Sequence, residues 1–354
     1  MGCQAVAVLP EEMSAERFNW LQKWGCDVVR TPGGEANVRE IYEKCDELRT
    51  ADPNNVILNQ FAEWGNPLGH YACTGKALGH VYEHVRDHGH KGLQLFGFTS
   101  ATGSAGTIAA GDRLKDDYGA KICCVEAVEC PTLLANGFGE HNIQGIGDKH
   151  LPFVHNVMNT DYVAGVSDAA TDSLAYAFNH PKGRKYLIER RGVPADVVDT
   201  LASFGYSGIA NMLAAIKLAK YHDLGADQAI VTVATDGFAM YKSEAPKLLR
   251  ERFGGKFDEV SAAECISQHL HGASEAHLQE LTHKDRERIF NLGYFTWVEQ
   301  RGVSVPDFCA RKDQRFWQEL RKQVGEWDKE IDRFNADVAA LNGGKSPGKK
   351  RARE

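Results

Sequence analysis

Residues 93–126 read LQLFGFTSATGSAGTIAAGDRLKDDYGAKICCVE, and this stretch decides the fold class. An apolar run (Leu93–Phe98) leads into a loop of small residues (Thr99–Gly106). A helical pattern follows (Thr107–Lys115), and then a second apolar run (Lys121–Val125) typical of a buried strand. Strand, tight loop, helix and strand in this order predict a βαβ unit, from which α/β folds with parallel sheets are built.

The loop TGSAGT (102–107) has side chains small enough for its backbone to close around an anion. Amide N–H groups at a helix N-terminus bind anions, and the helix dipole favours negative charge there. The sequence is not GxGxxG and lacks the GK[ST] ending of a nucleotide-binding P-loop. It therefore predicts a site for a single phosphate, and an ordinary strand-to-helix turn is the alternative interpretation.

Composition limits the function classes. The chain has 354 residues, 43% of them hydrophobic, and a net charge of −7, which favours a large core in two lobes and argues against nucleic-acid binding. No apolar run is long enough to span a membrane, so we expect no membrane partner. Nine cysteines without a CxxC pair predict thiols in a reducing compartment, and hence a cytoplasmic location.

The rest of the chain to about residue 234 alternates between strand and helix patterns, which predicts a mostly parallel sheet covered by helices. We expect strands at Gln4–Leu9, Cys26–Arg30 and Ala229–Ala234, and helices from Ser14 to Trp24 and at Val38–Leu48, Ala72–Arg86 and Ile209–Lys220.

The chain beyond Phe290 has a different pattern. Apolar residues recur there at steps of three and four, which predicts one long amphipathic helix that packs on its own body or on a subunit partner. They are Phe316, Leu320, Val324, Trp327, Ile331, Phe334, Val338 and Leu341. Residues 343–354 form a basic, flexible tail, for which a nuclear address is a weak alternative.

Three histidines lie four residues apart in one predicted helix: His80, His84 and His88. Imidazoles in this register are able to bind zinc, but HVYEH is not HExxH and the flanking residues are polar. We therefore interpret them as a solvated helix face and expect no metal. No GxSxG motif is present to indicate Ser/His/Asp hydrolysis.

Seven stretches follow one another in a characteristic order. They are LPEEMSAERFNWLQKWGCDVVRTPGG (9–34), NQFAEWGNPLGHYACTG (59–75), TGSAGTIAAGDRLK (102–115), VEAVECP (125–131), HNIQGIG (141–147), SGIANMLAAIKLAK (207–220) and VATDGFAMYKSE (233–244). Together they resemble the cysteine synthase group of the tryptophan synthase β superfamily, which binds pyridoxal 5′-phosphate (PLP). The resemblance implies a two-lobed α/β/α fold of three layers.

The resemblance also implies roles for single residues. Gln60 matches the glutamine that helps to hold the substrate carboxylate, and Gly145 matches a backbone position that lines the cofactor. Thr235 matches the Ser or Thr hydroxyl placed against the pyridine nitrogen, and a neutral group at that place suits β-elimination. Asp236 is the alternative partner of the pyridine nitrogen, and with Asp236 as the partner this electronic argument would reverse. The family's phosphate-binding loop matches Gly103, Ser104, Ala105, Gly106 and Thr107, with Ser104 and Ala105 in place of the usual Thr and Gly.

One family feature has no counterpart. Family members attach PLP through a lysine in a Ser-x-Lys-[Asp/Asn] segment, followed by a TSGN-type loop, and both precede the LPEEMS segment, which begins here at residue 9. Lys23, Lys44 and Lys76 lie in a different sequence context. We therefore identify no catalytic residue and expect an incomplete small lobe.

The resemblance implies four parts of the chain: the remainder of the small lobe (1–90), a large PLP-binding lobe (91–290), a helical extension (291–342) and the tail (343–354). It implies PLP-dependent β-replacement or β-elimination on serine- or cysteine-type amino acids in a homodimer, with cysteine synthesis first. Cystathionine synthesis, cysteine desulfhydration and hydroxy-amino-acid dehydration share these residues. The alternatives are a non-catalytic or regulatory homologue, and a PLP-independent binder of phosphate ligands.

Overall fold

A computed structural model of the chain describes residues 3–341, and the predicted tail at 343–354 lies outside them. The described chain divides into two compact units, residues 3–303 and residues 304–341. The boundaries expected near residues 90 and 290 remain proposals.

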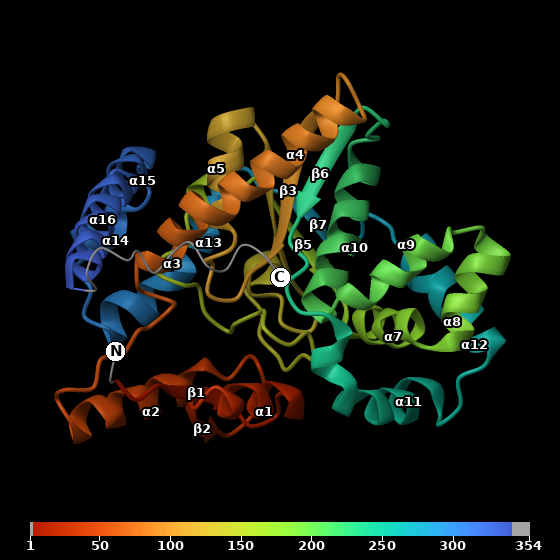
Figure 1. Cartoon of the computed structure of the whole chain (residues 1–354), viewed down its shortest axis with the longest axis horizontal. Helices are drawn as coiled ribbons and strands as arrows, with labels where there is room; N and C mark the ends of the chain where they lie inside the picture. The colour runs from red at the N-terminus through yellow and green to blue at the C-terminus, as the bar shows by residue number, and fades with distance from the viewer. Residues whose placement is uncertain (1–2, 342–354) are drawn as a thin grey trace. The chain divides into compact units, whose positions relative to one another are not determined.

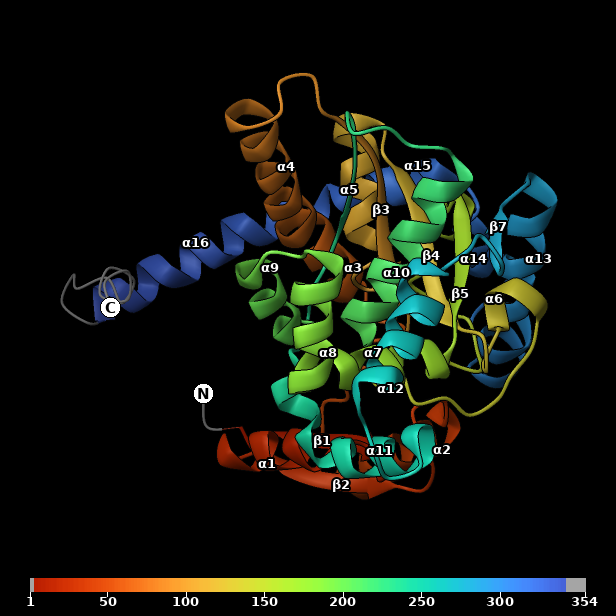
Figure 2. The same cartoon turned by 90° about the vertical axis from the view of Figure 1, so that its right-hand side faces the viewer.

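The first unit is built on a five-stranded sheet (Figures 1 and 2). Four strands are parallel and the last is antiparallel. Their order across the sheet is β6 (Gln228–Thr232), β3 (Gln94–Ala101), β4 (Lys121–Ala127), β5 (Tyr162–Val166) and β7 (Leu278–Glu280). The predicted α/β class with a mostly parallel sheet is confirmed.

Helices cover both faces of this sheet: α4 and α5 lie on one face and α10 on the other (Figure 1). The close approach of α5 depends on Gly111, because a Cβ there would lie 2.8 Å from Phe98 and 3.1 Å from Ile122. The helices are α3 (Gly65–Gly69), α4 (Lys76–His88), α5 (Ala109–Tyr118), α6 (Thr132–Ala135), α7 (Asp168–Asn179), α8 (Pro181–Lys185), α9 (Ala195–Thr200), α10 (Tyr206–Tyr221), α11 (Ala245–Phe253), α12 (Glu259–Ile266) and α13 (His283–Tyr294).

A second, smaller sheet pairs β1 (Val6–Pro10) with β2 (Asp27–Thr31) in parallel. It is accompanied by α1 (Ala15–Lys23) and α2 (Val38–Ala51), as Figure 2 shows. Ser14 stands at the N-cap of α1, where the sequence predicts the start of a helix. The predicted strands and helices of this region therefore lie within about two residues of the observed ones, apart from the C-terminal end of α2.

The second unit contains α14 (Val305–Ala310), α15 (Gln314–Arg321) and α16 (Gln323–Leu341). The expectation of one unbroken helix through the apolar stripe is wrong, because α15 ends at Arg321 and α16 begins at Gln323. Lys322 between them keeps right-handed helical dihedrals (φ −63°, ψ −25°), so the break is local. Within this unit the Trp317 indole donates to the carbonyl oxygen of Arg311 (2.8 Å).

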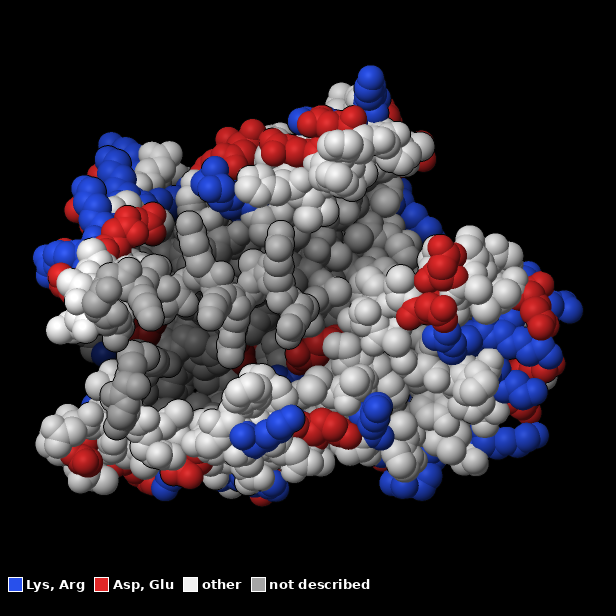
Figure 3. All heavy atoms as spheres, in the orientation of Figure 1, with Lys and Arg blue, Asp and Glu red and all other residues white. Residues whose placement is uncertain are grey.

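Charged side chains of both signs are interspersed over the face shown in Figure 3. None of the helices in the described residues is long and apolar enough to cross a bilayer. All nine cysteines are free thiols, and those of β4, Cys123 and Cys124, are completely buried.

Candidate functional site

The predicted phosphate loop begins where β3 ends, at the carboxyl edge of the main sheet. The neighbouring strand β6 runs parallel to β3, with Thr99 opposite Thr232, so the segment leading to Thr235 leaves the same edge. In open parallel sheets, ligands bind at this edge.

Asn211 of α10 ties the two loops together. Its side-chain oxygen accepts a hydrogen bond from the Ala101 N–H (2.6 Å), and its side-chain nitrogen donates to the Val233 carbonyl (3.0 Å). Asn211 is only 2% exposed, so these bonds are shielded from water. It therefore fixes the distance between the ends of β3 and β6.

The loop itself presents unused hydrogen-bond donors. Within the described chain, the amide N–H groups of residues 103–108 make no hydrogen bond to another protein group. The hydroxyl of Thr102 is also buried without a partner among the described residues. Six consecutive free amides before the first turn of α5 form a site for an anion. We call Gly103–Thr107, which supply five of these amides, the phosphate cup.

Asn66 in α3 lies against the phosphate cup. Its side-chain nitrogen donates to the Ser104 hydroxyl (3.1 Å) and to the Gln60 carbonyl (2.8 Å). A Cβ on Gly106 would lie 2.0 Å from the Asn66 side chain, so any other residue there would have to displace the Asn66 amide from its place against the phosphate cup. Sequence analysis missed Asn66; its place before Pro67, inside the NQFAEWGNP segment, was the available signal.

The glycine-rich segment around Gly145 lies on the other side of the phosphate cup. The Gly147 N–H donates to the Thr102 carbonyl (3.0 Å), and a Cβ on Gly103 would lie 3.5 Å from the Gly145 carbonyl oxygen. The structure therefore brings Gly145 beside the phosphate cup. The role of Gly145 toward a cofactor stays a prediction.

Two carboxyl groups that the sequence analysis did not single out are buried beside this segment. Burial raises the pKa of Glu35, although the Gly145 N–H and the charge of Arg17 oppose the shift. Burial and the neighbouring Glu35 raise the pKa of Asp148 to about 8. Asp148 Oδ2 would lie 3.7 Å from a Cβ on Gly103, so below that pH a neutral acid faces the phosphate cup.

Thr235 and Asp236 face different partners. The Thr235 and Ser207 hydroxyls are hydrogen-bonded at 3.0 Å. The Asp236 carboxylate instead accepts from Arg17 of α1 (2.9 Å), and the Tyr241 hydroxyl lies 3.3 Å from it. Arg17 therefore holds the carboxylate, while the Thr235 hydroxyl pairs with a second neutral hydroxyl.

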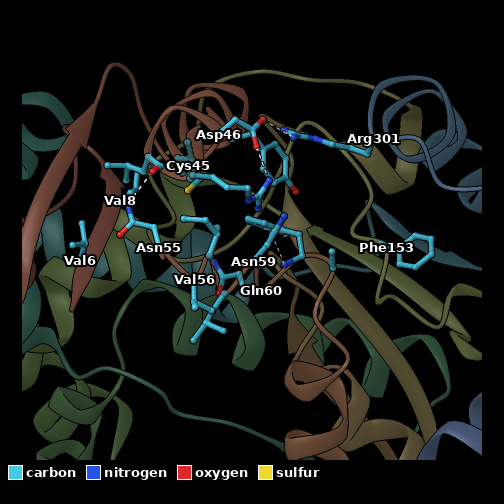
Figure 4. Close-up of a pocket in the computed structure, with 18 of the residues that line it drawn as sticks. Val6, Val8, Cys45, Asp46, Asn55, Val56, Asn59, Gln60, Phe153 and Arg301 are labelled. Carbon is cyan, nitrogen blue, oxygen red and sulfur yellow. Dashed lines mark hydrogen bonds and ion pairs between the residues drawn. The ribbon is translucent and has the colours of Figure 1, made fainter. Parts of the chain in front are cut away.

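Gln60 lies apart from the phosphate cup, in the wall of a large pocket of about 1070 Å³ (Figure 4). β1, α2, the segment 54–62 and residues near Arg301 line this pocket, and the cup residues do not. The Arg301–Asp46 ion pair (2.7 Å) closes one side of it. Gln60 is exposed, and its backbone is tied to the phosphate cup through Asn66.

The histidines of α4 lie on an exposed face of the helix. His84 and His88 stack with ring centroids 4.3 Å apart, and both are exposed. Among the described residues, no three His, Cys, Asp or Glu side chains gather in a way that would hold a metal ion.

Comparisons with known proteins relate the chain to cysteine synthases. No family model matches the chain. It is 31% identical over 169 residues to a probable cysteine synthase of Bacillus subtilis, covering 47% of this chain and 52% of that protein. It is 28% identical over 244 residues to the cysteine synthase of Staphylococcus aureus, covering 68% of this chain and 69% of that protein. Over these stretches the chain is similar to cysteine synthases.

Solved structures show the same fold. A hydrogen sulfide-producing enzyme of Fusobacterium nucleatum superposes with a TM-score of 0.56 at 24% identity, over 74% of this chain and 70% of that one. Cysteine synthase of Entamoeba histolytica superposes with a TM-score of 0.54 at 20% identity, over 76% of this chain and 70% of that one. The predicted two-lobed fold of the tryptophan synthase β type is thus confirmed, while the chain spans between about half and 70% of the length of these relatives.

Proposed function

We propose that this chain binds PLP with its phosphate in the cup Gly103–Thr107. The observation that carries the proposal is the row of six unpaired amides at the N-terminus of α5. A buried Thr102 hydroxyl without a described partner adds a further donor. The residues present therefore suit a phosphate monoester.

The remaining residues support the orientation of such a cofactor. Thr235, paired with Ser207, offers a neutral hydroxyl to the pyridine nitrogen, and Arg17 keeps the Asp236 carboxylate engaged elsewhere. Gln60 is proposed to hold the substrate carboxylate. When bound, PLP supplies an electron sink for bonds at the amino-acid α-carbon.

The proposed reaction is β-replacement or β-elimination on serine- or cysteine-type amino acids. The first candidate is the formation of cysteine from O-acetylserine and sulfide. The relatives' names support this reaction class, since they include cysteine synthases and a cystathionine β-synthase of Apis mellifera. We propose a homodimer in the cytoplasm, supported by the free thiols.

The cofactor site is tested with pyridoxine 5′-phosphate, which has no aldehyde and therefore needs no lysine. We expect saturable binding by calorimetry in the wild type and none in Gly106→Val, because the new side chain would collide with Asn66. Gly325→Val is the matched control, because a Cβ at Gly325 meets nothing within 4 Å. A wild type that does not bind, or a Gly106→Val variant that binds as well, would refute the proposed site.

Catalysis is tested separately. The chain is incubated with PLP, O-acetylserine and sulfide, and the cysteine formed is measured; sulfide release from cysteine is measured in parallel. Borohydride reduction followed by mass spectrometry identifies any lysine that carries the cofactor. Binding of pyridoxine 5′-phosphate without turnover and without a labelled lysine would favour the alternative, a non-catalytic homologue.

A further inference from the structure

The helix α16 carries an apolar seam with the repeat of a coiled coil. Its members are separated by three and four residues in strict alternation, which is the 3.5-residue period of a left-handed supercoil. We call this set the α16 seam: Val324, Trp327, Ile331, Phe334, Val338 and Leu341. α16 is a single unbroken helix (Figure 2) of 19 residues, about 28 Å long.

Within the second unit most of the α16 seam is exposed, and Val324 and Val338 are half-buried. No residue of α16 is buried, and the exposed fractions are 40% for Trp327, 55% for Ile331, 65% for Phe334 and 88% for Leu341. An apolar stripe left in water on one helix face is a feature of interaction sites. Its narrow a/d form fits another helix rather than a small ligand.

We propose that the occupant is the α16 of a second copy of this chain, in a parallel two-stranded coiled coil. With Trp327, Phe334 and Leu341 at the d positions, the a positions hold Val324, Ile331 and Val338. β-Branched residues at a favour two parallel strands. The proposal does not depend on the proposed enzymatic function.

The charges beside the α16 seam agree with self-pairing in this orientation. In a parallel pair, each g residue meets the e residue five positions later on the second copy. Gln323 then meets Asp328, and Glu330 meets Asn335. Each pair joins a carboxylate to an amide, which is able to donate a hydrogen bond to it.

An antiparallel pair is less favourable. With the same apolar layers in contact, g residues face g residues, and Glu330 would lie near Asp337 of the second copy. Two-fold symmetry repeats this contact, so two carboxylate pairs would be juxtaposed. The outer face carries the Lys329–Glu326 ion pair (2.7 Å), which self-pairing leaves in solvent.

Sedimentation equilibrium of the full chain tests the association. A seam of fewer than three heptads predicts a dimer that dissociates on dilution. Ile331→Glu should raise its dissociation constant by about a hundredfold, because a carboxylate would enter the apolar seam. Ala336→Glu adds the same charge on the exposed outer face and should leave the constant unchanged. A wild type that is monomeric at all concentrations, or an Ile331→Glu variant that dimerises like the wild type, would overturn the proposal.

Disulfide trapping tests the orientation. Leu341→Cys places the thiols of both copies side by side in a parallel pair, whereas an antiparallel pair separates them by about 25 Å. Ala336→Cys on the outer face controls for cross-linking by the exposed native thiols Cys3, Cys73 and Cys309. Under oxidation we expect cross-linked Leu341→Cys dimer well above the control level, and equal amounts would overturn the parallel arrangement.

Discussion

Ala105 adopts a backbone conformation that glycine adopts more easily. Its φ is +62°, in the left-handed region, although it is buried in the phosphate cup. An L-residue pays roughly 1 kcal/mol for this conformation. Ala105→Gly should therefore raise the free energy of unfolding, measured in urea, by up to about 1 kcal/mol, less the entropy that glycine gains in the unfolded chain.

The reverse change at Gly119 is the control for this prediction. Gly119 has φ +74° with open space around its Cβ position. Gly119→Ala should lower the free energy of unfolding by about 1 kcal/mol. If Ala105→Gly were instead destabilising, the methyl group of Ala105 would contribute more by packing than its conformation costs.

Asp148 should make stability depend on pH. In the folded chain its pKa is about 8, whereas an unfolded aspartate titrates near 3.9. Between these values the unfolded chain binds fewer protons, so stability falls as pH rises, by at most about 1.4 kcal/mol per pH unit. Asp148→Asn lacks this pH-dependent loss of stability. The free energy of unfolding of Asp148→Asn minus that of the wild type, both measured in urea, should therefore be larger at pH 8 than at pH 5.

The same titration should affect anion binding. Above pH 8 an ionised Asp148 would stand beside the phosphate cup, and pyridoxine 5′-phosphate should bind more weakly in the wild type than in Asp148→Asn. Replacement of the exposed Glu63 by Gln is the control and should show neither effect. Equal pH profiles for the wild type and Asp148→Asn would exclude this role.

Part of the candidate site could be singled out from the sequence because that part is local, and its function stays a prediction. The phosphate cup could be predicted since its small residues are contiguous and precede a helix. The role of Asp148 could not be predicted, and the sequence gives only a weak signal for Asn66, because the importance of both comes from tertiary contacts: Asn66 reaches Ser104 across 38 positions. The same holds for Arg17, which meets Asp236 from a helix 219 positions away.

At the level of elements, α10 holds the ends of β3 and β6 together through Asn211. Asn211→Leu would leave the Ala101 N–H and the Val233 carbonyl buried without their partner. We expect the free energy of unfolding, measured in urea, to fall by about 2–3 kcal/mol. Pyridoxine 5′-phosphate should also bind more weakly, because both loops of the site start at the ends of β3 and β6. Asn179→Leu is the control, since that amide bonds within its own helix; equal losses in the two variants would contradict the bridging role.

The elements missed by the sequence analysis are those with weak periodicity. β5 has five buried residues, YVAGV, but such a short apolar run does not distinguish strand from helix. β7 has three residues and pairs antiparallel with β5, so only the completed sheet defines it. By contrast, β3, α5 and β4 were predicted to within about three residues, because glycine and the small-residue loop mark their ends.

For the first unit as a whole, the small sheet depends on its attachment to the larger body. Two strands alone are marginally stable in water. α1 supplies the attachment: Glu16 accepts hydrogen bonds from the Ser243 N–H (2.9 Å) and hydroxyl (2.6 Å), while Arg17 binds Asp236. The same contacts fix the turn that carries Thr235, so the position of the small sheet and the geometry of the site are coupled.

Arg17→Met should loosen this attachment. The Arg17 and Asp236 side chains are 23% and 37% exposed, so the pair contributes only about 1 kcal/mol to global stability. Its loss should act locally: hydrogen exchange should become faster in α1, β1 and β2 while β3, β4 and β5 keep their protection. Arg39→Met removes an exposed ion pair with Glu43 inside α2 and should leave exchange in α1 unchanged. Uniformly faster exchange across both sheets would mean that the two sheets unfold together and that Arg17 is not a local attachment.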